Sequence, residues 1–109
     1  MCGLFAYAGS VNAVPILLDG LRSVEYRGYD SAGISVITES GSIETRKHGD
    51  HKASLNNLHS AVTGDQLFGL VGIGHTRWAT HGVVNHANSH PHCSVDGSIS
   101  IAHNGIIEN

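Results

Sequence analysis

A cysteine directly follows the initiator methionine, a position in which it could do chemistry. Removal of Met1 would make Cys2 the first residue, and cysteine is small enough for that removal. The thiol would then lie beside a free α-amino group, whose ordinary pKa of about 7.7–8.0 makes it a general base near neutral pH. The position therefore allows an N-terminal nucleophile. From position alone a small cysteine buried in the core is the favoured interpretation, and the apolar strand expected directly after Cys2 weakens that preference.

A polar segment at 74–82, with the sequence GHTRWATHG, follows an apolar run at 67–74. Loops at the ends of strands commonly present binding residues. The guanidinium of Arg77 is a planar fork that can bind a carboxylate through two hydrogen bonds. Its neighbours with aromatic or polar side chains are Trp78, Thr80 and His81. The segment predicts a carboxylate-binding site, and a surface arginine lying over the tryptophan is the structural alternative.

The triplet His103-Asn104-Gly105 combines a turn signal with two groups that can stabilise negative charge. Asn-Gly is first of all a dipeptide of tight turns. The side-chain amide of Asn104 and the backbone N–H of Gly105 can also point together at an oxygen that becomes negative during a reaction. The triplet therefore fits either a simple turn or an oxyanion hole.

Nine histidines are many for a chain of 109 residues, so a metal site has to be considered. The compact group consists of His86, His90, His92 and Cys93. Zinc sites usually combine a C-x₂₋₄-C pair with an H-x₃₋₅-H pair, and the chain has no such combination. The spacing disfavours a metal, and no cofactor is expected. A small zinc- or copper-binding module is the alternative from a different functional class.

Local patterns predict the elements that hold these residues. An apolar run at 3–8 predicts a buried strand, and a helix should follow it, with Asn12 as N-cap and Pro15 in the first turn. Runs at 32–38 and 43–47 around Ser-Gly-Ser predict a hairpin. Further along, we expect a helix at 53–62, a buried strand at 67–74, a loop at 76–94 and a strand at 98–103 after Asp-Gly. Interleaved helices and antiparallel strands predict the α+β class.

The composition limits the size and the class of the protein. A chain of 109 residues makes one domain at most, and 40% apolar with 14% charged residues exclude a disordered acidic or basic tail. A net charge of −3 offers no basic surface for nucleic acid or an anionic membrane. No stretch approaches the ~18 apolar residues of a membrane span, and two cysteines fit a reducing cytoplasm. A dinucleotide fingerprint is excluded, because 72–77 lacks the third glycine.

Four segments, taken together and in this order, resemble the class II glutamine amidotransferases, which are N-terminal-nucleophile enzymes. They are Met1-Cys2-Gly3, EYRGYDSAG at 25–33, HTRWATHG at 75–82 and HNGIIEN at 103–109. Within the class, the second and third segments are most similar to those of the glucosamine-6-phosphate synthases. The phosphoribosyl-transferring relatives are the alternative within the class, and they would be expected to carry a different residue in place of Tyr29.

The resemblance implies a role for each candidate residue. Cys2 would attack the side-chain amide of L-glutamine, and its α-amine would act as base and then as proton donor to ammonia. Asn104 and the N–H of Gly105 would form the oxyanion hole, and Arg77 would hold the α-carboxylate of the substrate. The residues expected to shape the glutamine pocket are Trp78, Thr80 and His81.

The resemblance also implies the fold and the partners. The family fold is a four-layer αββα sandwich with antiparallel sheets, and we expect residues 1–109 to be the N-terminal part of a single glutaminase domain. Family members continue past the Asn-Gly motif, so the isolated chain is expected to be nearly inactive. Ammonia would pass to a sugar isomerase domain, where fructose-6-phosphate becomes glucosamine-6-phosphate. The expected parent protein is a cytoplasmic homodimer.

Overall fold

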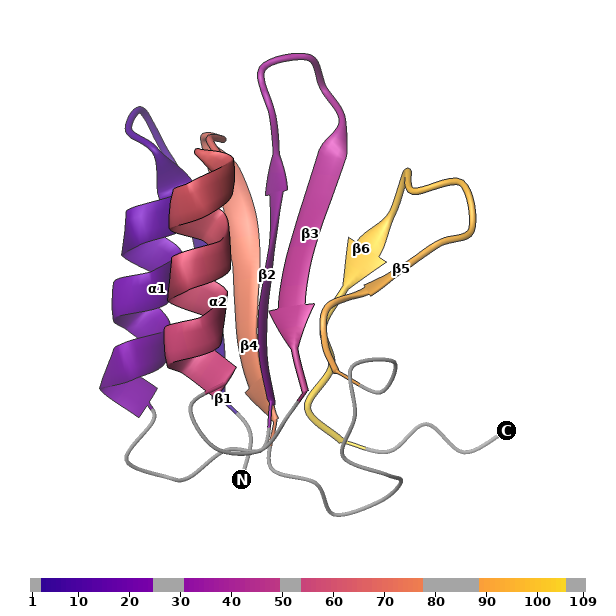
Figure 1. The fold of residues 1–109 in the computed structure, drawn as a ribbon. Coiled ribbons are helices and arrows are strands. Elements are labelled where there is room, and N and C mark those ends of the chain that lie inside the picture. Colours follow the sequence, from indigo (N-terminus) through magenta and orange to yellow (C-terminus); the bar gives the residue numbers. More distant parts are fainter. Residues whose placement is uncertain (1–2, 25–30, 50–53, 78–88, 106–109) are drawn as a thin grey trace.

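The computed structural model describes residues 3–24, 31–49, 54–77 and 89–105. Its main sheet has four antiparallel strands in the order β1-β4-β2-β3 (Figure 1). The bounds are Gly3–Ala8 for β1, Ser31–Ile37 for β2, Ile43–His48 for β3 and Val71–Arg77 for β4. Strand β4 lies between β1 and β2, so its residues have pairing partners on both sides.

Two helices, α1 (Ala13–Val24) and α2 (Ser54–Asp65), cover one face of this sheet (Figure 1). A second, two-stranded sheet of β5 (His92–Cys93) and β6 (Ser100–Ile101) lies on the opposite side. Side-chain contacts between described residues join it to the main sheet, among them Ser35 Oγ to Ser100 Oγ at 2.6 Å and Thr45 Oγ1 to Cys93 Sγ at 3.1 Å. The predicted α+β class with antiparallel sheets is confirmed.

The hydrophobic core fills the space between the helices and the main sheet. Its largest fully buried apolar side chains are Leu17, Leu21, Ile34, Leu55 and Leu58. Helix α1 approaches β4 closely because Gly72 has no side chain, and a Cβ built there would lie 2.7 Å from Cδ1 of Leu17. Burying each such leucine contributes about 1.5–3 kcal/mol relative to leaving it exposed, so this packing holds the sheet against the helices.

Helix α1 begins as the sequence predicts. Asn12 Oδ1 accepts a hydrogen bond from the backbone N–H of Val14 at 3.2 Å, which makes Asn12 the N-cap. The same oxygen accepts the N–H of Gly69 at 3.3 Å. One side chain therefore caps the helix and ties it to the segment that leads into β4.

The predicted hairpin and second helix are also confirmed. The turn between β2 and β3 closes with the N–H of Thr38 donating to the carbonyl of Ser42 at 2.9 Å. Helix α2 extends to Asp65, three residues beyond the predicted end at 62. Its last residue accepts a hydrogen bond from Arg46 Nε of β3 at 2.6 Å, so this contact to the sheet accompanies the extra turn.

The expected strand at 67–74 and loop at 76–94 are wrong in their bounds. Strand β4 begins at Val71 and continues through Thr76 and Arg77, and residues 92–93 form β5. The reason is pairing: Thr76 lies opposite Gly3 and Ala32, and Arg77 lies opposite Ser31. Partners that are distant in the sequence, rather than the local apolar pattern, set the end of the strand.

The expectation that β1 is buried is only half right. Its side chains alternate, with Phe5 packed against the core and Leu4 49% exposed on the other face. On that same face, away from the helices, Ile37 and Val71 are also more than two-fifths exposed. The expected strand at 98–103 shortens to β6, and Ile101 within it is exposed.

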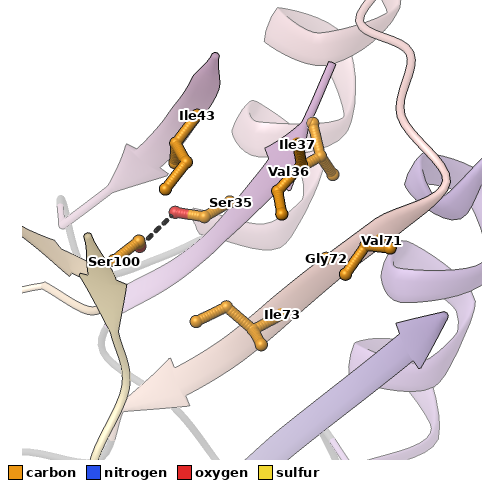
Figure 2. Close-up of a pocket in the computed structure, with 8 residues that line it drawn as sticks. All are labelled: Ser35, Val36, Ile37, Ile43, Val71, Gly72, Ile73 and Ser100. Carbon is orange, nitrogen blue, oxygen red and sulfur yellow. Dashed lines mark hydrogen bonds between the residues drawn. The ribbon is translucent and has the colours of Figure 1, made fainter. Parts of the chain in front are cut away.

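The two sheets enclose a shallow apolar cavity of about 120 Å³ where they meet (Figure 2). Ile37, Ile43 and Ile73 line its main-sheet side, and Ser100 reaches it from β6. The face away from the helices is thus partly covered by the second sheet and partly open. Neither of the described helices is long and apolar enough to cross a membrane.

Candidate active site

Three neighbouring strands begin or end at the same end of the main sheet. Strand β1 begins at Gly3 and β2 begins at Ser31, and both pair with the last residues of β4. Gly3 lies opposite Thr76, and Ser31 lies opposite Arg77. Gly3 directly follows the candidate nucleophile in the chain. The register thus brings Gly3, the residue after Cys2, and Arg77, the candidate carboxylate-binding residue, to the same end of the sheet.

The predicted site residues are only partly within the described chain. Cys2, Trp78, Thr80 and His81 lie outside it. Arg77 is half-buried at the end of β4, and Asn104 and Gly105 are exposed beyond β6. Gly105 has a φ of +144°, a conformation that side chains rarely adopt, so glycine is the residue suited to this position.

His75 connects the candidate oxyanion residue to the sheet. Its Nε2 lies 2.6 Å from Oδ1 of Asn104, although the two residues are 29 positions apart in the sequence. Because side chains alternate along β4 and Gly72 faces Leu17, His75 projects from the face away from the helices, like Arg77. Its side chain is fully buried there, and Nδ1 has no hydrogen-bond partner among the described residues. Burial is the main cause that lowers the pKa of His75 below its ordinary value, so the ring is neutral at pH 7.

His90 packs over His75 and holds the neighbouring backbone. The two ring centroids are 4.3 Å apart, and His90 Nδ1 accepts a hydrogen bond from the N–H of His103 at 3.3 Å. Burial first, and then repulsion from the charged forms of His75 and His92, lower the pKa of His90 to about 4. At neutral pH the Nδ1 lone pair is therefore available to accept that hydrogen bond.

The segment that carries His90 is fastened to β2 and β3. Lys47 Nζ donates to the carbonyl oxygens of Ser89 at 2.9 Å and Pro91 at 3.2 Å. The backbone of His90 lies directly on Gly33, where a Cβ would collide with the His90 carbonyl oxygen. Absence of a side chain at position 33 thus allows this segment to reach the sheet.

Replacing Gly33 with alanine is expected to lift the 89–91 segment from the sheet. The new Cβ would also lie 2.8 Å from Cβ of Lys47, and a backbone oxygen cannot rotate away as a side-chain tip can. We expect a loss of about 1–3 kcal/mol in local stability, as for other overpacked sites. Hydrogen exchange of the peptide 89–105, measured by mass spectrometry, should become faster.

Gly64→Ala is the matched control for this substitution. A Cβ at Gly64 would enter open space on helix α2. It should leave exchange at 89–105 unchanged and stabilise the helix by about 0.5–1 kcal/mol. Equal exchange rates at 89–105 in both variants would contradict the steric argument.

The sequence did not reveal that His75 and His90 support the Asn104 segment. His75 belongs to the segment 75–82, which resembles the amidotransferases, but no local pattern links it to position 104. Among the residues that the structure describes, no three histidine, cysteine or acidic side chains are grouped so as to hold a metal ion. Of the group considered for a metal, His86 lies outside the described residues.

Comparison with known proteins points in the same direction as the motifs. No protein-family model matches the chain. The glutamine–fructose-6-phosphate aminotransferase (isomerizing) of Caldanaerobacter subterraneus is 53% identical to it over 109 residues, that of Thermus thermophilus 52% and that of Staphylococcus aureus 49%. Each match covers 100% of this chain and 17% or 18% of the relative, so the chain spans about one sixth of their length. The resemblance to the N-terminal region of these aminotransferases is confirmed.

Proposed function

We propose that this chain forms the N-terminal part of a glutamine-hydrolysing domain, in a protein that transfers the ammonia to fructose-6-phosphate. The observation that carries the proposal is the match of the whole chain, at 49–53% identity, to aminotransferases named for that reaction. The strand register supports this proposal, because it brings Gly3, which follows Cys2 in the chain, and Arg77 to the same end of the main sheet.

Cys2 is the nucleophile of the proposed reaction. Its sulfur forms a bond to the amide carbon of glutamine, and collapse of the tetrahedral adduct breaks the C–N bond and releases ammonia. The α-amine of Cys2 takes the thiol proton and returns one to the leaving nitrogen. Water then cleaves the thioester, which yields glutamate and restores the thiol.

The other proposed site residues stabilise the negatively charged groups of the substrate and of the tetrahedral adduct. Asn104 and the N–H of Gly105 stabilise the oxyanion of the tetrahedral adduct, and Arg77 pairs with the α-carboxylate of glutamine. The residues proposed to complete the glutamine pocket are Trp78, Thr80 and His81. Support for Asn104 comes from its fixed hydrogen bond to the sheet through His75.

The complete domain is proposed to be a four-layer αββα sandwich. The described part is consistent with three of these layers: the helices, the main sheet and the start of a second sheet in β5 and β6 (Figure 1). Leu4, Ile37 and Val71 leave apolar surface on the main sheet, on the side where a larger second sheet would pack. Residues 1–109 are then one part of a single domain.

The proposed partners are a glutamine substrate and a sugar isomerase domain in the same protein. Fructose-6-phosphate is the ammonia acceptor, in agreement with the name of the relatives, and the family resemblance implies that glucosamine-6-phosphate is the product. We further propose, from the same resemblance, that the full protein is a cytoplasmic homodimer.

A product assay with the full-length protein tests this proposal. With L-glutamine and fructose-6-phosphate, glutamate and glucosamine-6-phosphate should form in equal amounts. Supplying phosphoribosyl diphosphate as acceptor instead should give no amine product. Amination of that acceptor would favour the phosphoribosyl-transferring alternative, and absence of glutamate under both conditions would reject glutamine hydrolysis.

A further inference from the structure

We propose that His75 is the positioning residue that orients the side-chain amide of Asn104 for oxyanion stabilisation. This inference rests on the proposed function, because it gives His75 a role only if Asn104 contacts the reacting oxygen. It is carried by the 2.6 Å contact between His75 Nε2 and Asn104 Oδ1.

The contact fixes which end of the amide faces the sheet. Oδ1 of Asn104 can only accept, so His75 Nε2 must carry the hydrogen. A neutral imidazole carries one N–H, which leaves Nδ1 unprotonated, in agreement with its lack of a partner among the described residues. The amide is planar, so its NH₂ group points away from His75. That NH₂ group is the donor that an oxyanion requires.

His75 is suited to this role because it cannot move easily. Its side chain is fully buried, and its backbone pairs with Leu4 on β1 and with Gly33 on β2. Asn104, in contrast, belongs to an exposed segment after the short strand β6. A hydrogen bond to a buried histidine on an interior strand of the main sheet holds this exposed side chain in one orientation.

His90 provides a second tie to the same segment. Its ring packs on His75, and its Nδ1 holds the backbone N–H of His103, the residue before Asn104. The side chain of Asn104 and the backbone next to it are therefore both attached to one stacked pair of histidines. This double attachment distinguishes positioning of Asn104 from general core packing by His75.

Two amide substitutions of His75 separate hydrogen bonding from packing. In His75→Gln the side-chain nitrogen takes approximately the place of Nε2 and can still donate to Asn104, whereas in His75→Asn it takes the place of Nδ1 and falls short. In the full-length protein, kcat for glutamine hydrolysis should remain within about twofold of wild type for His75→Gln. It should fall about ten- to a hundredfold for His75→Asn, because small misplacements of a catalytic group have such effects.

Two further readouts exclude a merely structural effect. KM for glutamine and the rate of Cys2 alkylation by iodoacetamide should be unchanged in His75→Asn, because neither depends on an oxyanion donor. His59→Asn is the control, since His59 is exposed on α2, and it should behave as wild type.

The outcomes distinguish a failure of the positioning role of His75 from a failure of the proposed glutamine hydrolysis. Equal kcat values in His75→Gln and His75→Asn would overturn the positioning role, and so would a loss of kcat in His75→Asn that comes with slower alkylation. Glutamine hydrolysis that persists without Cys2 would instead overturn the proposed function itself. A kcat loss confined to His75→Asn, with KM and alkylation unchanged, supports both.

Discussion

Replacing Cys2 with alanine is expected to abolish the use of glutamine by the full-length protein while sparing product formation from added ammonia. The reason is that the covalent route has no substitute nucleophile once the sulfur is removed, and the α-amine then has no thiol to deprotonate. In the proposed reaction, ammonia enters after the glutamine-hydrolysing step, so the acceptor reaction should not need residue 2. The measurement is the rate of glucosamine-6-phosphate formation with glutamine and, separately, with ammonium salt.

Cys93→Ala is the matched control, because Cys93 is the other cysteine of the chain. Cys93 is exposed on β5, where its Sγ contacts Thr45 Oγ1 at 3.1 Å. This variant should use glutamine and ammonia as the wild type does. Glutamine-dependent product formation that survives in Cys2→Ala, or that disappears in Cys93→Ala, would contradict the assignment of the nucleophile.

The elements with strong local signals were predictable from the sequence. Helix α1 has an N-cap at Asn12 and an apolar face, and the β2–β3 hairpin has a turn of small residues at 40–42. These features depend on residues within a few positions of one another, so a local pattern contains the needed information. The α+β class followed from the same elements.

The end of β4 was not predictable in this way. Thr76 and Arg77 are polar and follow an apolar run, so the local pattern ends the strand too early. Their place in the sheet depends on Gly3 and Ser31, which are more than 40 positions away in the sequence. Non-local pairing of this kind is invisible to periodicity.

In the candidate site, too, the sequence indicates which residues could take part but not how they are arranged in space. Asn104 and Arg77 could be named as candidates because their chemistry and their motifs are distinctive. The contact of His75 with Asn104 was missed, because a buried histidine on a strand has no local signature of what it contacts. Only the path of the chain after β6 brings Asn104 within hydrogen-bond distance of His75.

Replacing Asn104 with alanine is expected to lower kcat for glutamine hydrolysis about 10²- to 10³-fold, the usual effect of removing one oxyanion donor. The substitution removes the NH₂ group that faces the reacting oxygen in the proposed site, and the ground-state complex does not use that group. KM for glutamine should therefore change little. Steady-state rates of glutamate release provide the measurement. Asn56→Ala is the control, because Asn56 is exposed on α2 and accepts a hydrogen bond from Arg22.

The double substitution determines whether His75 acts through Asn104. If His75 only orients the Asn104 amide, then His75→Asn should change kcat by less than about twofold once Asn104 is alanine, although it lowers kcat strongly in the wild type. Independent roles would instead multiply the two losses. A multiplied loss in the double variant would show that His75 contributes to hydrolysis by another route, even if Asn104→Ala alone behaves as expected.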